Sequence, residues 1–182
     1  MKNNHLFSIF KFTNAQKVLS FLADNVGKEF VGSEIQKATG ISKAGVYLAL
    51  AELVKCELVV KVKKGGLLLF NANYQSPFVK QFKMLLNVIQ LKPVLDSIRD
   101  LSTKIVLYGS ASRGEDSPDS DIDLFIVSKD TKITQEKLFK VKFNRKIQSV
   151  IKVPSEIPEF KAKEKVFFDE VSRGITLWEM KE

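Results

Sequence analysis

Two aspartates separated by one residue stand at the start of an apolar, β-prone run. Asp121 and Asp123 flank Ile122, and the run continues to Val127. Because residues i and i+2 of a strand point to the same face, we expect the two carboxylates to converge. Neighbouring carboxylates repel each other unless a cation lies between them, and Mg²⁺ prefers oxygen ligands. The pair is therefore a candidate metal site of the kind that phosphoryl or nucleotidyl transfer uses.

A second candidate feature lies upstream, where another apolar run ends in glycine and serine. The run 104–108 leads directly into Gly109 and Ser110, and Arg113 follows. Glycine lets a ligand approach the backbone closely, and free N–H groups at the start of a helix favour anions. The Ser110 hydroxyl can donate a further hydrogen bond, and the Arg113 guanidinium can bind the same phosphates. These residues are candidates for binding a nucleotide.

The Asp-x-Asp pair alone has an ordinary structural explanation. Aspartate is frequent in turns, and Ser117-Pro118 is a turn signal, so the pair by itself fits a loop. Combined with the upstream glycine, serine and arginine at this spacing, it favours a site that binds nucleotide and metal.

These residues need a rigid framework, and the C-terminal part of the sequence predicts one. Strands are predicted at 104–108, 122–127, 146–153 and 175–179, and helices at 134–145 and from about 156 to 173. Alternation of strands and helices is typical of α/β structure. We therefore predict an α/β domain over 102–182.

The two candidate features also match a known pattern. Residues 109–114 read G-S-x-x-R-G, and residues 120–124 read S-D-I-D-L. Together they resemble the signature of minimal nucleotidyltransferases of the DNA polymerase β superfamily, and 174–179 is similar to the end of such domains. The resemblance implies that Gly109 and Ser110 bind the phosphates of a nucleoside triphosphate. It also implies that Asp121 and Asp123 are catalytic and ligate divalent metal ions. The fold that it implies for 102–182 is a mixed sheet with flanking helices.

The sequence departs from this pattern at the third carboxylate. Active members of the family supply it from a following strand, where it completes the metal site and helps to activate the attacking hydroxyl. No Asp or Glu occurs between Glu136 and Glu156, and Gln148 or Ser149 lies about where the acid is expected. Neither can act as a carboxylate base, so nucleotide or metal binding is predicted and catalytic turnover is left open.

The first part of the sequence predicts three helices and a β-hairpin. The helices cover 14–25, 32–40 and 42–55, and two β-prone runs flank a turn with Gly65-Gly66. A further helix starts at 76, is interrupted at Pro93 and continues to about 101. We expect domains at 1–75 and 102–182, joined by a connecting helix at 76–101.

Residues 14–74 resemble a winged helix-turn-helix module, as found in many prokaryotic regulators. In such modules the third helix enters the major groove of DNA and the hairpin wing contacts the backbone. The resemblance implies binding of double-stranded DNA. The residues that would face it are Ser42, Lys43, Ala44 and Tyr47 on the helix and Lys61, Lys63 and Lys64 on the wing. The alternative is a protein–protein or dimerisation element with solvated lysines, and the 76–101 helix could serve as a homodimer interface.

The charge distribution separates the two halves. The 182 residues carry a net charge of +8; residues 1–100 hold 14 Lys or Arg and 7 Asp or Glu, and residues 101–182 hold 15 and 14. A basic first half is what binding to a phosphate backbone requires, although Lys-rich surfaces also serve solubility.

Several classes of protein do not fit the sequence. No apolar run approaches the roughly 20 residues that span a bilayer, and Met1–Phe10 lacks the features of a signal peptide. Cys56 is the single cysteine, which leaves no intrachain disulfide or thiolate cluster. We expect a cytoplasmic protein.

Two functions follow from these observations. The first is Mg²⁺-dependent transfer of a nucleoside monophosphate from a triphosphate such as ATP to a hydroxyl on a protein, RNA or small molecule. The alternative is a catalytically degenerate regulator that senses a nucleotide and binds DNA. A third possibility, an antitoxin-like partner of a ribonuclease, follows only from analogy with related minimal transferases.

Overall fold

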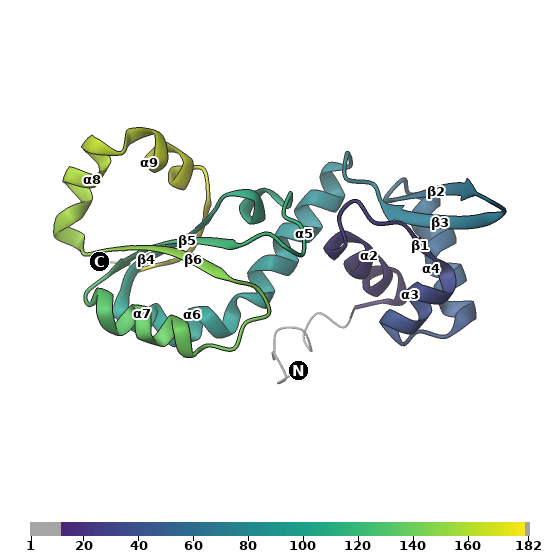
Figure 1. The fold of residues 1–182 in the computed structure, drawn as a ribbon, viewed down its shortest axis with the longest axis horizontal. Coiled ribbons are helices and arrows are strands. Elements are labelled where there is room, and N and C mark those ends of the chain that lie inside the picture. Colours follow the sequence, from purple (N-terminus) through teal and green to yellow (C-terminus); the bar gives the residue numbers. More distant parts are fainter. Residues whose placement is uncertain (1–11, 181–182) are drawn as a thin grey trace. The chain divides into compact units, whose positions relative to one another are not determined.

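The computed structural model describes residues 12–180 and divides the chain into two compact units between Leu86 and Asn87 (Figure 1). Met1–Phe10, for which we predicted that no signal peptide is present, lies outside the described residues. The division falls within helix α5 (Pro77–Gln90), so the helices of 76–101 contribute to both units. Val79 and Phe82 of α5 pack in the core of the first unit, whereas Val88 packs in that of the second.

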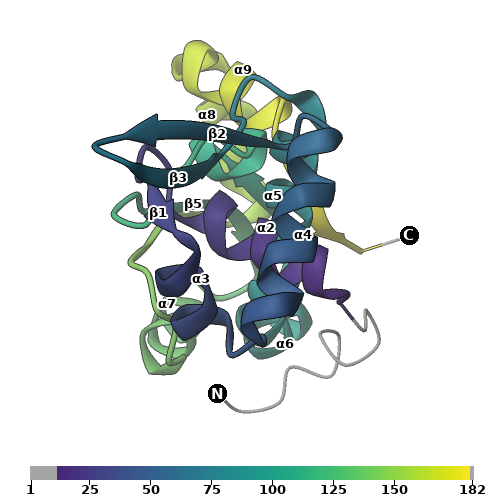
Figure 2. The same cartoon turned by 90° about the vertical axis from the view of Figure 1, so that its right-hand side faces the viewer.

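In its described part, from residue 12 on, the first unit combines three helices and the start of α5 with a small antiparallel sheet (Figures 1 and 2). The helices are α2 (Asn14–Asp24), α3 (Gly32–Thr39) and α4 (Lys43–Lys55). The strands are β1 (Phe30–Val31), β2 (Val59–Lys64) and β3 (Leu67–Ala72), in the order β1-β3-β2. The predicted helices and hairpin are therefore present, and the sheet gains a short first strand.

Local signals explain most of the boundaries in this unit. Ser42 caps α4 by accepting a hydrogen bond from the Gly45 N–H, and Gly40 ends α3 with φ of +69°. At α2, the N-cap is Thr13. Thr13 and Gln16 form a reciprocal capping box, which the sequence reading overlooked.

The second unit is a four-stranded mixed sheet with helices on both faces. Its strands are β4 (Ser102–Tyr108), β5 (Ile122–Ser128), β6 (Ile147–Lys152) and β7 (Ile175–Glu179), in the order β6-β5-β4-β7. Strand β4 is antiparallel to β5 and β7, whereas β5 is parallel to β6. Helices α6 (Lys92–Ile98) and α7 (Thr131–Lys140) cover one face, and α8 (Ile157–Lys163) and α9 (Lys165–Ser172) cover the other (Figure 1).

Helix α7 corrects the prediction of a helix at 134–145. It begins three residues earlier because the Asp130 side chain accepts a hydrogen bond from the Ile133 N–H at 3.0 Å. It ends at Lys140 because Val141 is extended, with φ of −73° and ψ of 122°. The segment 141–146, which we expected to be largely helical, instead leads the chain back to the start of β6.

Strand β5 separates two apolar cores. Ile122, Leu124 and Ile126 face the core under α6 and α7, whereas Phe125 and Val127 face the core under α8 and α9. By alternation, Asp123 belongs to the α8–α9 face. No helix within residues 12–180 has both the length and the apolar character needed to cross a bilayer.

The burial of the β5 side chains in the core gives a first prediction. Leu124 is fully buried, so we expect Leu124→Ala to lower the free energy of unfolding by about 2–5 kcal/mol. Ile133→Ala on α7, where the side chain is 45% exposed, is the control and should cost less than about 1 kcal/mol. Fluorescence of Trp178, the single tryptophan, in a urea titration reports this unit. Equal losses in the two variants would contradict the assignment of β5 to the core.

Candidate active site

The contact between Gly109 and Asp123 organises the site. Gly109 has φ of +68° and ψ of −157°, a conformation that favours glycine. A Cβ placed on Gly109 would lie 2.3 Å from Oδ2 of Asp123, so the carboxylate leaves no room for a side chain there. The two residues meet because Tyr108 and Asp123 are paired across β4 and β5. Two residues of the predicted site are thus in direct contact.

A single 3₁₀ turn, Ser110–Arg113, follows the glycine and holds Ser110 beside it. The Ser112 hydroxyl donates to the Gly109 carbonyl at 2.8 Å, and the Glu115 N–H donates to the Ser110 carbonyl at 3.0 Å. The turn is therefore fixed from both ends by hydrogen bonds.

Arg113 lies between two carboxylates. Its Nε donates to Oε2 of Glu115 at 3.1 Å, and its Nη1 lies 3.8 Å from Oε1 of Glu170 on α9. The Arg113 side chain is about half exposed, so these contacts are open to solvent. A phosphate at the predicted position would have to compete with both acids for the guanidinium.

Asp121 is paired with a lysine that immediately precedes β6. Its Oδ2 accepts a hydrogen bond from Lys146 Nζ at 3.0 Å, and its backbone carbonyl accepts one from Arg145 Nη2 at 3.4 Å. Lys146 is 75% exposed, which makes its pair with Asp121 a solvent-screened one.

A buried ion pair fixes the loop that carries Asp121. Nη1 of Arg145 donates to Oδ2 of Asp116 at 2.6 Å, and the two side chains are only 13% and 2% exposed. Asn87 donates from Nδ2 to Oδ1 of Asp116 at 2.9 Å and to the Ala111 carbonyl at 3.0 Å. This network ties the glycine–serine turn to the aspartate loop. The sequence reading missed it, because the three side chains are far apart along the chain and Arg145 was placed in a helix.

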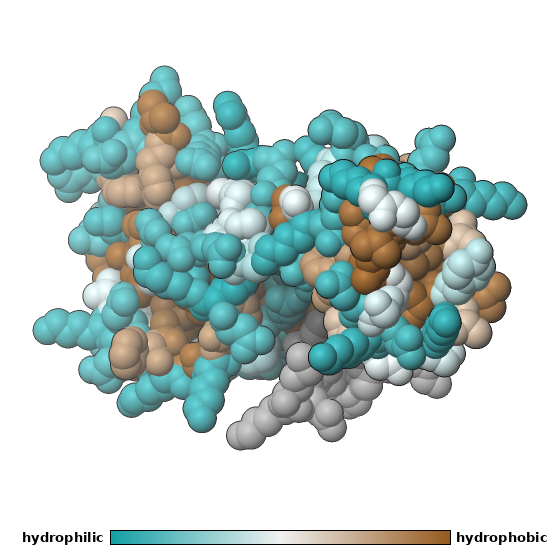
Figure 3. All heavy atoms as spheres, turned by 45° about the vertical axis from the view of Figure 1, so that its right-hand side comes forward, coloured by the Kyte–Doolittle hydropathy of each residue, from teal (hydrophilic) through white to brown (hydrophobic). Residues whose placement is uncertain are grey.

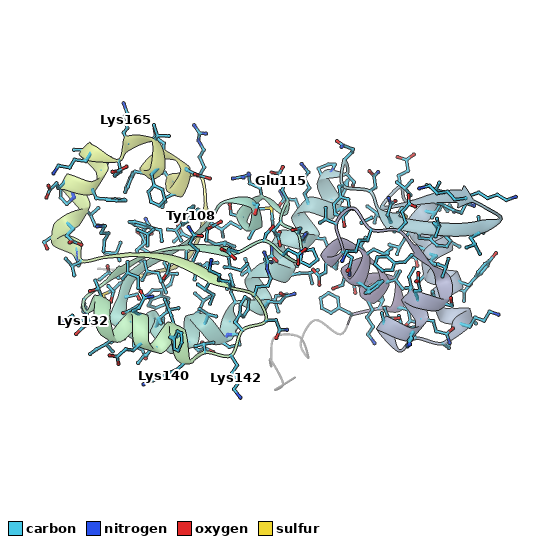
Figure 4. The ribbon with its side chains drawn as sticks, in the orientation of Figure 1. Tyr108, Glu115, Lys132, Lys140, Lys142 and Lys165 are labelled. Carbon is cyan, nitrogen blue, oxygen red and sulfur yellow. The ribbon has the colours of Figure 1, made fainter. Side chains whose placement is uncertain are left out.

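Negative charge accumulates around Asp123. Burial raises the pKa of its carboxyl group, and the charges of Asp121 and Glu170 raise it further. Burial also raises the pKa of Tyr108 to about 12, again with contributions from Asp123 and Glu170 (Figure 4). Glu170 thus acts on the same face of the sheet from helix α9, where the sequence gave no motif to identify it.

The register of β5 and β6 settles which residue stands beside Asp123. Asp123 is paired with Gln148, so both lie on the α8–α9 face, and Gln148 is exposed. Ser149 is paired with the buried Leu124 and therefore belongs to the opposite face. Of the two residues considered for the missing acid, Gln148 occupies the position.

The residues present fit a divalent cation that arrives with phosphates. Within residues 12–180, no three acidic, histidine or cysteine side chains form a ready-made metal-binding group. Mg²⁺ does not need one, since it commonly keeps several waters and takes one or two carboxylates plus phosphate oxygens. Asp121 and Asp123 are the residues that would supply those carboxylates, and a cation would relieve the repulsion that, after burial, raises the pKa of Asp123.

Comparison with known protein families agrees with this reading of the second unit. Residues 88–174 match the family model described as a nucleotidyltransferase domain. The matched stretch runs from the end of α5 to the residue before β7 and includes all the candidate residues from Gly109 to Asp123. A search of curated proteins found no match. The second unit is therefore similar to nucleotidyltransferase domains.

The two neighbouring cations Arg145 and Lys146 provide a matched test of the loop. Arg145→Ala should lower the free energy of unfolding by about 3–5 kcal/mol, because it removes the guanidinium that pairs with the buried Asp116 carboxylate. Lys146→Ala should cost at most about 1 kcal/mol, because its pair with Asp121 is exposed. Urea denaturation followed by Trp178 fluorescence measures both. Similar values for the two variants would show that the Arg145–Asp116 pair does not fix the loop.

Proposed function

We propose that the protein is a Mg²⁺-dependent nucleotidyltransferase that moves a nucleoside monophosphate from a nucleoside triphosphate to a hydroxyl acceptor. The observation that carries the proposal is the packing of the Asp123 carboxylate against Gly109, with Asp121 two residues before it. These residues lie within the stretch that matches the nucleotidyltransferase domain model. Asp121 and Asp123 are assigned as the catalytic residues and metal ligands.

The nucleotide is assigned to the glycine–serine turn. Gly109, which is buried, has no side chain to separate its backbone from Asp123, and the Ser110 hydroxyl beside it would donate to a phosphate oxygen. Arg113 is assigned to neutralise phosphate charge, for which it exchanges its exposed contacts with Glu115 and Glu170. A divalent cation, when bound, would neutralise charge on the phosphates undergoing transfer.

The missing strand acid has one replacement that the packing supports. Glu156 accepts a hydrogen bond from the Val153 N–H and Glu159 pairs with Lys163, so both are engaged away from Asp123. Glu170 shares its face of the sheet with Asp123, and α9 is anchored there by contact between the rings of Tyr108 and Phe167 at 5.3 Å. We assign the third negative charge of the site to Glu170.

A transfer assay with radiolabelled ATP or CTP tests the enzyme. The double variant Asp121→Ala, Asp123→Ala should reduce the transfer rate by about a hundredfold or more, since it removes the charged centre of the site. Glu170→Gln should lower the rate, whereas Glu159→Gln, a control on α8, should leave it unchanged. Gln148→Asp should raise the rate, by up to about 10²-fold, because it adds a carboxylate beside Asp123. Transfer that survives the double substitution would overturn the assignment.

The same assay separates the enzyme from its alternative, a nucleotide-sensing regulator. Gln148 in place of an acid is the observation that favours the regulator. A regulator predicts nucleotide binding without transfer in the natural protein, with transfer gained in Gln148→Asp. An enzyme predicts transfer in both.

For the first unit we propose a winged helix-turn-helix that binds double-stranded DNA through residues 14–74. Helix α4 exposes Lys43, Ala44 and Tyr47, and Tyr47 is 74% exposed. The hairpin adds Lys61, Lys63 and Lys64, of which Lys64 pairs with Glu29 at 2.8 Å. Ser42 completes the proposed contact set beside its role as a cap. Figure 3 shows both hydrophilic and apolar residues on the surface of this unit. The apolar residues fit the alternative, in which the unit binds a protein or forms a dimer.

DNA binding can be tested by fluorescence anisotropy with a duplex of random sequence. Lys61→Ala with Lys63→Ala should weaken binding and reduce the slope of log K against log salt by about 1.8, that is about 0.9 for each lost phosphate contact. Lys17→Ala with Lys28→Ala removes the same charge from other exposed positions of this unit and is the control. An equal change in both pairs would favour the protein-binding alternative, as would a change in oligomeric state on sedimentation.

A further inference from the structure

The small net charge of the C-terminal half conceals a strongly basic stretch. Residues 129–146 hold seven Lys or Arg and two Asp or Glu, a net charge of +5. The remainder of 101–182 holds eight Lys or Arg and twelve Asp or Glu, a net charge of −4. Charge of opposite sign is therefore segregated within this half, which mixing for solubility alone does not require.

The structure presents this charge on helix α7 and the segment that follows it. Thr134 and Leu138 face the core, and the lysines of the helix are exposed. Four lysines, which we call the α7 lysines, are Lys132, Lys137, Lys140 and Lys142. Within the part of the chain that the structure describes, none of the four forms an ion pair. In Figure 4, Lys132, Lys140 and Lys142 lie along one side of the sheet, whereas Lys165 lies on the other.

An aromatic side chain stands among these lysines. Phe139 is 92% exposed, although its neighbour Leu138 is buried in the core. Water-exposed phenylalanine between cations has no packing function in this unit, but it offers a face on which an unpaired base can stack. Lysines with an interleaved aromatic ring form the combination by which proteins bind single strands without sequence preference.

The basic surface ends at the proposed active site. Helix α7 packs on the face of the sheet opposite Asp123, and the segment 141–146 then crosses to the end of the sheet where β5 begins. There Arg145 Nη2 contacts the Asp121 carbonyl and Lys146 Nζ contacts the Asp121 carboxylate at 3.0 Å. Positive charge thus continues from α7 to the first of the two aspartates.

We propose that α7 and residues 141–146 bind single-stranded nucleic acid, with the α7 lysines on its phosphates and Phe139 stacked on a base. Resting on the proposed function, we further assign the bound strand as the acceptor, with a terminal hydroxyl delivered to Asp121 and Asp123. This names a nucleic acid among the acceptors that a nucleotidyltransferase site alone leaves open.

Other polyanions fit this surface less well. A duplex has no unpaired base to stack on Phe139, and an acidic protein has no reason to meet an isolated phenyl ring. A membrane-surface helix inserts a broad apolar face, whereas the core-facing positions Thr134 and Leu138 of α7 are buried in the protein. Apart from Phe139, only Ile133 is a substantially exposed large apolar residue on this helix.

The test is anisotropy of a fluorescein-labelled 12-nucleotide oligouridine RNA with the full chain, in the absence of nucleoside triphosphate. The triple variant Lys137→Ala, Lys140→Ala, Lys142→Ala should weaken binding tenfold or more and reduce the salt slope by about 2, since each single-strand phosphate contact contributes about 0.7. Phe139→Ala should weaken binding about tenfold with the slope unchanged, because stacking releases no counterions. The control Lys161→Ala, Lys163→Ala, Lys165→Ala, on α8 and α9, should bind as the natural protein does.

Each alternative has a distinct outcome, and thermal midpoints confirm that all variants fold. Equal weakening by the control triple, or no effect of Phe139→Ala, would overturn the proposal. So would tighter binding to phosphatidylserine vesicles than to RNA, or a change in sedimentation of Phe139→Ala that identifies a self-association surface. Asp121→Ala with Asp123→Ala should still bind RNA. If this double variant binds RNA but no longer transfers to it, the two aspartates act in the active site and not in RNA binding. If the triple variant of the α7 lysines still binds RNA, the proposed RNA-binding surface is refuted, whereas the transferase proposal is unaffected.

Discussion

The contact between the Asp123 carboxylate and the Gly109 backbone is the constraint on which the rest of the second unit depends. It requires a residue without a side chain at φ of +68°, and it requires β4 and β5 to pair in one register, Tyr108 opposite Asp123. A shift of that register by one residue would turn Asp123 into the α6–α7 core and bring a leucine or isoleucine to the glycine. The alternation of apolar residues along β5 therefore positions the chemistry as well as the core.

What could be predicted from the sequence follows from the range of the interactions. Gly109, Asp121, Asp123 and the strands that carry them depend on local patterns, namely alternation, turn residues and spacing, which are legible in a single chain. The Asp116–Arg145 pair and the position of Glu170 depend on packing between segments about 30 to 50 residues apart, which no local pattern encodes. The choice of Gln148 over Ser149 likewise needed the register of two parallel strands, because neighbouring residues on a strand point to opposite faces.

The segment after α7 shows how a local pattern can mislead. The sequence allows a helix through Arg145, yet the helix stops at Lys140 because the side chains of Arg145 and Lys146 are held at the aspartate loop. Helix propensity amounts to a few tenths of a kcal/mol per residue, whereas breaking a buried ion pair costs several. Tertiary contacts therefore determine where α7 ends: the helix is shorter than its sequence allows, and the contacts of Arg145 and Lys146 at the aspartate loop are kept.

The charged residues around Asp121 and Asp123 form one strong, buried ion pair and several weak, exposed ones. Burial of Asp123 and the charges of Asp121 and Glu170 raise the pKa of Asp123, which opposes folding at any pH above the pKa of an unfolded aspartate. Arg113, Arg145 and Lys146 surround these acids, but only the Arg145–Asp116 pair is well buried, and the exposed pairs are weak. The strong pair fixes the backbone, while the weak ones leave carboxylates and cations free to exchange partners. Under the proposed function, a cation would lie between the acids and phosphates would lie against Arg113, and only solvent-screened contacts would have to break for them to bind.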